Sequence, residues 1–266
     1  MNKIEDAIKG LYSIDKITNS ESFLYRIHPL AKLLVTFCYI VLLTSINIYF
    51  LENTLAMGIY IILISIIGNL SIKRSIKRLK ILFIILFLIG IANPILDRNV
   101  VIYIGILPIT TGLISMITLF LKGFFAVISS YFLIETTGIE GICYALKMLH
   151  IPNILITVFM LIYRYIIVFL NELKKIWTAY SLRSPNQKGF NYKVWGSMIG
   201  NLIIRSMDKA QDVYESMELR GFNPDTYFIK EQRIDNVSFI YLSLGIIFIF
   251  AIRYIPIFEL IGNIFI

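Results

Sequence analysis

The chain alternates between long apolar runs and short polar stretches. An α-helix needs about 20 apolar residues to cross the hydrocarbon of a bilayer, whereas a membrane β-barrel shows alternation over about ten residues instead. Six apolar runs follow one another, at Leu33–Leu51, Leu55–Ile72, Ile81–Ile95, Leu113–Ile134, Ile154–Leu170 and Val237–Ile252. The pattern predicts an all-α polytopic membrane protein. We expect about five transmembrane helices plus a cytoplasmic or interfacial domain of long amphipathic helices.

Composition supports this class. Hydrophobic residues make up 58% of the 266 residues, against roughly half in soluble proteins. The net charge is +8, and the basic residues flank the apolar runs. We interpret that charge as a topology signal rather than as a nucleic-acid footprint. Cys38 and Cys143 lie in apolar surroundings without CxxC spacing, so we expect packing residues. The expected environment is the lipid bilayer, with no nucleic acid as partner.

The basic cluster Lys73–Lys80 orients the predicted helices. Cytoplasmic loops are enriched in Lys and Arg, so we place this loop and the N-terminus inside and the turn Glu52–Thr54 outside. Residues 1–30 form a predicted interfacial segment, because Ile4, Ala7, Ile8 and Leu11 share a helix face. Residues 31–152 hold predicted transmembrane helices 1–4, with an irregular stretch around Gly105 and Pro108.

The fifth apolar run sets a parity problem. If Ile154–Leu170 crosses the bilayer, the ten Lys and Arg residues of segment 172–236 lie outside, against the charge rule. The run also carries Arg164, and an arginine at the bilayer centre costs about 2.5–3.5 kcal/mol. We therefore interpret the run as a helix packed against the others or lying near the inner interface. Whether it fully spans stays open. The last predicted transmembrane helix lies in 237–266, with its C-terminus outside.

Residues 153–236 form a predicted domain of two long amphipathic helices that end alike. The first closes with Leu182, Arg183, Ser184 and Pro185, and the second with Leu219, Arg220, Gly221 and Phe222. Taken once, such an end is a good helix cap, with glycine in the left-handed position and Phe222 folding back in a Schellman contact. Taken twice, it suggests a docking device, because an arginine can grip a carboxylate with two hydrogen bonds.

The second of these helices is predicted to run from about Val194 to Leu219. One face carries apolar positions at helical spacing, namely Ile199, Ile203, Ala210, Val213 and Met217, with Ser206 between them. Charged residues occupy the rest of the surface. Arg205 and Asp208 can pair along the surface of this helix, and so can Lys209 and Asp212.

At these residues the chain resembles the transmembrane T component of energy-coupling factor (ECF) transporters, specifically the cobalt-type CbiQ family. The likeness covers essentially the whole chain and is most specific in the last stretch. The stretches that carry it are His28–Leu33, Gly112–Ser115, Leu149–Pro152, Tyr163–Ile166, Gly200–Ser206 and Ala210–Phe222.

The resemblance implies an energy-coupling subunit without chemistry of its own. In that family, arginines in Ala-Arg-Gly-like motifs on two cytoplasmic coupling helices engage two ABC-type ATPase subunits. Carried over, these arginines are Arg183 and Arg220, and 153–236 is the coupling domain. Leu182 and Leu219 stand in place of the alanines and Ser184 in place of the first glycine, whereas Gly221 is kept.

The other implied partner is a substrate-binding membrane S component of the cobalt type, which the subunit reorients in a bacterial or archaeal cell membrane. ATP is used by the partner subunits, so no cofactor is expected on this chain. The residues agree, because the sequence has no GxxxxGK[ST] phosphate loop. His28 and His150 are isolated, so we expect no metal site. His28 is expected to shape a helix start and His150 a connection.

Lys122 and Arg164 are the charges within apolar runs, and such charges are candidate functional residues by default. The plainer interpretation is that each satisfies backbone carbonyls or extends to the interface. We expect a structural role for Arg164 and leave Lys122 open.

Three alternatives remain from the sequence. The substrate could be nickel, biotin or another vitamin, since a partner selects it. A self-sufficient permease would need polar groups facing each other at the midplane. An intramembrane enzyme would need paired carboxylates, a Ser/His couple or a metal set. The sequence also leaves open whether the two ATPases are identical.

Overall fold

The structure is a computed structural model that describes residues 23–97, 100–104, 107–183, 192–222 and 235–254. The chain divides into two compact units. What we call the bundle unit contains the described residues up to Gly138 together with the last helix. What we call the hairpin unit contains the described residues from Ile139 to Phe222.

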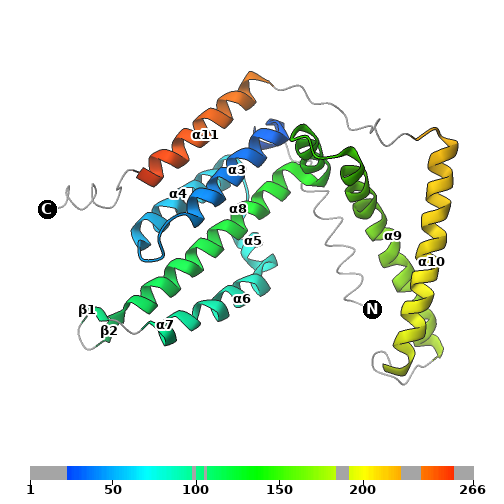
Figure 1. Cartoon of the computed structure of the whole chain (residues 1–266), viewed down its shortest axis with the longest axis horizontal. Helices are drawn as coiled ribbons and strands as arrows, with labels where there is room; N and C mark the ends of the chain where they lie inside the picture. The colour runs from blue at the N-terminus through cyan, green and yellow to red at the C-terminus, as the bar shows by residue number, and fades with distance from the viewer. Residues whose placement is uncertain (1–22, 98–99, 105–106, 184–191, 223–234, 255–266) are drawn as a thin grey trace. The chain divides into compact units, whose positions relative to one another are not determined.

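The described chain is almost entirely helical (Figure 1). The elements are α2 (Phe23–Arg26), α3 (Pro29–Thr44), α4 (Leu51–Ile67), α5 (Ile72–Arg78), α6 (Lys80–Gly90), α7 (Ala92–Leu96), β1 (Val100–Ile104), β2 (Leu107–Thr110), α8 (Thr111–Met148), α9 (Asn153–Arg183), α10 (Tyr192–Leu219) and α11 (Asn236–Tyr254). Among the described helices, α8, α9 and α11 are long and apolar enough to cross a membrane, and the bent pair α4–α5 makes a fourth candidate. The predicted class, an all-α polytopic membrane protein, is confirmed.

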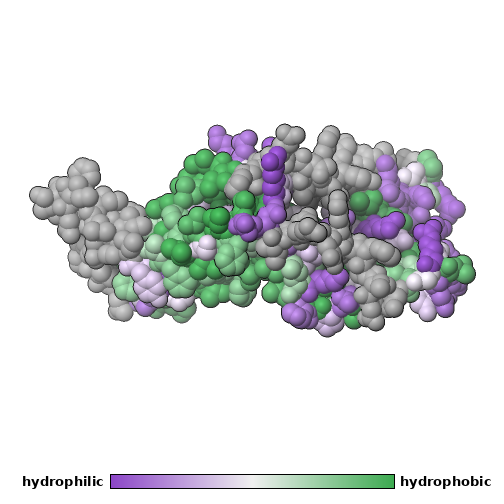
Figure 2. Space-filling view, turned by 90° about the horizontal axis from the view of Figure 1, so that it is seen from above, coloured by the Kyte–Doolittle hydropathy of each residue, from purple (hydrophilic) through white to green (hydrophobic). Residues whose placement is uncertain are grey.

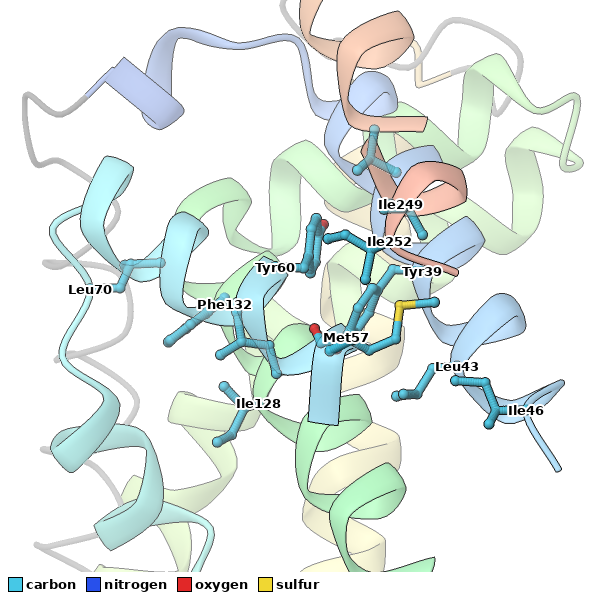
Figure 3. Close-up of a cluster of buried hydrophobic side chains, with 13 residues drawn as sticks. Tyr39, Leu43, Ile46, Met57, Tyr60, Leu70, Ile128, Phe132, Ile249 and Ile252 are labelled. Carbon is cyan, nitrogen blue, oxygen red and sulfur yellow. The ribbon is translucent and has the colours of Figure 1, made fainter. Parts of the chain in front are cut away.

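The core of the bundle unit joins α3, α4, α8 and α11 (Figure 3). Val35, Tyr39 and Leu43 are fully buried and recur every four residues of α3, so they form one helix face. The Tyr39 ring stacks on that of Tyr60 at 4.2 Å, and its hydroxyl donates to the Met57 carbonyl at 3.1 Å. Burial of such aromatic pairs fixes the helices relative to one another.

Helix α3 starts at a histidine–proline pair that also ties it to α11. The side chain of His28 accepts a hydrogen bond from the Leu30 amide at 3.2 Å, and Pro29 occupies the first turn. Proline at that position loses no helical hydrogen bond. The His28 amide donates to Ser238 Oγ at 2.9 Å. The prediction that His28 shapes a helix start is confirmed, and His150 lies in the α8–α9 connection with a φ of 62°.

The basic cluster predicted as a loop is instead mostly helical. Helix α5 covers Ile72–Arg78 and is bent from α4 by 108°. The bend passes through Asn69 at a φ of 52°, a left-handed conformation that asparagine tolerates better than most residues. Ser71 caps α5 by accepting from the Arg74 amide. The cap satisfies one of the amides at the start of α5, which favours helix over loop for this short segment.

Two connections differ from the prediction. The turn expected at Glu52–Thr54 is wrong: the chain turns earlier, between α3 and α4, and Glu52 lies in the first turn of α4, where a carboxylate suits the positive end of the helix dipole. The stretch around Gly105 and Pro108 was expected to be irregular. It contains β1 and β2, an antiparallel pair that joins Ile104 to Leu107.

Apolar side chains also cover much of the exterior. Hydrophobic residues gather on the face of the bundle unit that Figure 2 shows. On α11 alone, Phe239, Leu244 and Ile247 are more than 60% exposed. Exposed apolar surface of this extent suits contact with lipid or with another membrane protein.

Several side chains of the fifth apolar run are exposed: Leu155, Phe159 and Ile162 are each more than half exposed. Helix α9, which contains the run, has the length and composition of a membrane span. The five-span topology and the placement of the N-terminus stay predictions.

One glycine in the bundle unit tests the packing of α7 against α8. A Cβ at Gly112 would lie 2.7 Å from both Asn93 O and Pro94 Cα, which are backbone atoms. Backbone cannot rotate away, so Gly112→Ala should destabilise the protein by about 1–3 kcal/mol. The measurement is the thermal unfolding midpoint in detergent. The matched control is Gly196→Ala, because a Cβ there meets nothing within 4 Å; equal midpoints for the two variants would contradict the packing.

Candidate functional site

The two helices of the hairpin unit, α9 and α10, run antiparallel beside each other (Figure 1). Their main polar link is Glu172 on α9. One oxygen of its carboxylate accepts from Lys175 Nζ at 2.7 Å, and the other lies 3.4 Å from Arg205 Nη1 of α10. Glu172 lies beyond the apolar run of α9, and the hydrogen bond from Lys175 lowers the pKa of its carboxyl. This link marks the level at which Glu172 of α9 lies beside Arg205 of α10.

The C-terminus of α10 is a complete Schellman motif. Gly221 has a φ of 69°, the Phe222 amide donates to the Met217 carbonyl at 2.9 Å, and the Gly221 amide donates to the Glu218 carbonyl at 2.9 Å. Both bonds define this motif. The predicted cap is therefore confirmed. It stops α10 with Leu219, 89% exposed, and Arg220 at the tip.

The end of α9 presents the other predicted pair. Arg183 is the last helical residue, and both it and Leu182 are exposed, Leu182 to 77%. Ser184, the third residue predicted here, lies outside the described residues. Each long helix thus carries an exposed leucine–arginine pair at its C-terminus. The cationic tip lies at the negative end of the helix dipole, as the electrostatics favour.

The two tips lie at opposite ends of the hairpin. Arg220 lies beyond the Glu172–Arg205 link in one direction, and Arg183 lies beyond it in the other. At a rise of 1.5 Å per residue, the two arginines are about 40 Å apart along the hairpin axis. A single small binding surface cannot engage both.

Between the link and the Arg220 tip, the two helices enclose an open groove of about 630 Å³. Its walls are mainly apolar and include Val158, Tyr165 and Phe169 from α9, with Val213 and Met217 from α10. Phe222, next to the cap glycine, lines the same groove. The residue that completes the Schellman motif is therefore also part of the apolar surface of the groove.

The predicted face of α10 is correct at one end only. Ser206, Ala210, Val213 and Met217 line the groove, whereas Ile199 and Ile203 are about half exposed. Arg205, which could pair with Asp208 along the helix, pairs with Glu172 of α9. When a helix has apolar residues on more than one face, its sequence does not show which face is buried. The neighbouring helix decides which face is covered.

Lys122, whose role the sequence left open, caps a helix end. Its Nζ donates to the Ile46 carbonyl and, at 3.5 Å, to the Thr44 carbonyl. Arg253 of α11 donates to the Ser45 carbonyl between them at 3.4 Å. Both cations thus satisfy carbonyls that follow the last turn of α3, where no intrahelical donor is available. This is the plainer of the two interpretations offered by the sequence.

Arg164 lies on α9 with its side chain exposed, and its structural role stays a prediction. Within the described parts of the chain, no three His, Cys, Asp or Glu side chains gather in a geometry that could hold a metal ion.

Two polar contacts of the bundle unit were missed from sequence. Lys32 is 4% exposed and donates from Nζ to the Thr136 carbonyl at 2.8 Å. Glu135, also 4% exposed, lies 3.7 Å from Arg74 Nη1. The signal available in the sequence was a lone charged residue among apolar neighbours. A charge that is buried in such surroundings must be paired or hydrogen-bonded.

Comparison with known proteins shows which family this chain is similar to. The sequence profile of the family described as "Cobalt transport protein", CbiQ, matches residues 20–228. An energy-coupling factor transporter transmembrane protein EcfT of Ruminiclostridium cellulolyticum is 26% identical, with 90% of this chain and 94% of the relative covered. An uncharacterized protein of Methanocaldococcus jannaschii is 26% identical over 91% of this chain and 89% of its own length. The nickel permease LarQ of Lactiplantibacillus plantarum is 32% identical over 33% of this chain and 32% of its own.

The cap of α10 is testable at Gly221. A Cβ there meets nothing within 4 Å, so a substitution acts only through the left-handed backbone. Gly221→Ala should cost about 1–2 kcal/mol, and Gly221→Asn less, because asparagine tolerates this conformation. The measurement is amide hydrogen exchange of residues 217–222, expected to speed up most in the alanine variant. Equal protection in all three proteins would show that the cap does not hold this end.

The cap of α3 is testable at Lys122. Lys122→Met keeps the length of the side chain but removes the donor to two carbonyls. Unsatisfied polar groups of this kind cost about 1–3 kcal/mol, so the thermal midpoint in detergent should fall. Lys80→Met, at an exposed lysine of α6, is the control and should leave the midpoint unchanged. A midpoint for Lys122→Met as high as that of the control would contradict the capping role.

Proposed function

Because the chain belongs to the CbiQ cobalt transport protein family, as its motifs indicated, we propose that it is the energy-coupling transmembrane subunit of an ECF-type ABC importer. In this proposal the subunit has no catalytic site. Two ABC-type ATPase subunits bind and hydrolyse ATP, and the chain transmits their motion to a separate substrate-binding membrane subunit. The N-terminus and the coupling domain 153–236 then face the cytoplasm.

One observation carries the proposal: an antiparallel hairpin ends at both extremities in an exposed leucine–arginine pair. A guanidinium on a rigid helix end can form a bidentate pair with a carboxylate in a partner's groove. The exposed Leu182 and Leu219 add apolar contact area around each ion pair. Arginine with adjacent apolar side chains is typical of the residues that dominate protein interfaces.

The spacing of the tips supports two ATPase partners rather than one. Arg183 and Arg220 are about 40 Å apart along the hairpin, by the rise of an α-helix. We propose that each tip docks into one ATPase of a pair, so that closure of the pair acts on both ends of the hairpin. The coupling residues are then Leu182, Arg183 and Ser184 at one tip and Leu219, Arg220 and Gly221 at the other.

For the substrate, we propose cobalt ion, following the description of the family. Nickel is the second candidate, since a relative named a nickel permease is 32% identical over a third of this chain. The metal is cargo selected by the substrate-binding partner, so residues of this chain do not decide between the two ions.

The docking role is tested by charge reversal at both tips. Arg183→Glu combined with Arg220→Glu should abolish co-purification of ABC-type ATPase subunits expressed together with the chain, because each carboxylate then faces a like charge. Either single variant should retain partial association. Arg220→Lys should also weaken association, since an ammonium lacks the planar fork of a guanidinium.

The matched control is Lys77→Glu, which makes the same charge change at an exposed residue of α5 in the bundle unit. It should leave ATPase association unchanged, and all variants should insert into the membrane equally. Normal ATPase recovery with the double variant would refute the docking role.

A further inference from the structure

The described chain passes between its two compact units inside α8, after Gly138. Although α8 runs without a gap from Thr111 to Met148, Gly138 has a φ of 68° and a ψ of 168°. That combination is essentially restricted to glycine. The long helix is therefore two helices joined at one residue, and this residue coincides with the border between the units.

The helix on the bundle side of the break is held by three cations. Arg78 Nη1 donates to the Tyr131 hydroxyl at 2.9 Å. One turn further on, Arg74 lies 3.7 Å from the buried Glu135 carboxylate. At the last turn, Lys32 Nζ donates to the Thr136 carbonyl at 2.8 Å. These contacts come from α5 and α3, so two separate helices fix the end of this segment.

The contact of Lys32 answers a requirement created by the break. The last four carbonyls before a helix end lose their intrahelical donors, and Thr136 is two residues before Gly138. In a buried position an unpaired carbonyl is costly. Lys32, itself buried, supplies the missing donor. The break is thus stabilised on the bundle side by a dedicated side chain, which would have no backbone partner in a continuous helix.

We propose that Gly138 is the pivot through which the hairpin unit moves relative to the bundle unit, and that Lys32 is the positioning residue that keeps the bundle side of the pivot fixed. This rests on the proposed function, in which force enters at Arg183 and Arg220. A rotation at Gly138, the junction between the units that the described residues contain, would let that force move the hairpin unit. The cationic side chains that contact Tyr131, Glu135 and Thr136 keep this end of α8 helical. The movement is then confined to the residue at the break.

The pivot is tested first in the chain alone, reconstituted in lipid nanodiscs with Cys38 and Cys143 replaced by alanine. Spin labels at Lys77 of α5 and Ala179 of α9 report the distance between the units. Gly138→Ala should shift or narrow this distance distribution, because alanine disfavours the backbone conformation of the break. A second label pair, Ala179 with Asp212 of α10, lies within the hairpin unit and should not change.

Lys32 is tested with two variants. Lys32→Met removes the donor while keeping a long side chain, and it should broaden the distribution between the units. Lys32→Arg keeps a donor and should restore most of the wild-type distribution. Lys80→Met is the control, at an exposed lysine of α6. If Gly138→Ala also changes the distance between the two labels within the hairpin unit, the Lys32 variants decide the test. Equal distance distributions between the units in Lys32→Met and Lys32→Arg would overturn the proposal.

The second measurement uses the chain with its ATPase and substrate-binding partners, and compares metal uptake per ATP hydrolysed. Gly138→Ala and Lys32→Met should each lower this ratio about tenfold while ATPase association stays normal. Unchanged ratios together with unchanged distances would reject the pivot. Failure of the wild-type chain to bind any ATPase would instead refute the proposed function, and the distances in the chain alone would still judge the pivot.

Discussion

A carbonyl that leaves its helical hydrogen bond inside an apolar environment must find another donor, and this constraint organises the bundle unit. Where the carbonyl belongs to a buried residue, as at Thr136, a side chain has to supply the proton. Three long cationic side chains do so: Lys32 for Thr136, Lys122 for Ile46 and Thr44, and Arg253 for Ser45. Each reaches from one helix to the broken end of another. The position of each helix end is therefore matched by the position of a cationic side chain on another helix.

This arrangement makes the two units mechanically different. In the bundle unit, apolar packing around Tyr39 and Tyr60 is reinforced by the cationic caps and by the Arg74–Glu135 pair. In the hairpin unit, the helices are joined by the Glu172–Arg205 link at one level and stand apart around an open groove beyond it. A firmly held part and an extended, sparsely held part suit the transmission of motion that we propose for this chain. Contact density decides which segments open or move at low cost.

Local features could be predicted from the sequence, and long-range ones could not. The Schellman end of α10 was predictable because Leu219–Phe222 specify it by themselves, through a glycine and an adjacent apolar residue. The start of α3 at His28–Pro29 was predictable for the same reason. The partner of Lys32 was not, because Thr136 lies 104 residues away. The partner of Arg205 could not be predicted either, because Glu172 of the neighbouring helix competes with Asp208 on the same helix.

The break at Gly138 shows why periodicity alone misjudges a long apolar helix. The residues on both sides of the break are compatible with helix, and one glycine in an apolar run is common, so the pattern predicts a helix that simply ends near Ile134. Two facts available only from the fold identify the break. The backbone conformation of Gly138 lies outside the region that other residues adopt. The buried Lys32 of α3 donates a hydrogen bond to the Thr136 carbonyl, two residues before the break. Burying a charge is costly unless it forms such a bond. A continuous helix would leave that cost uncompensated, so Lys32 and Gly138 are best understood as one feature of this fold.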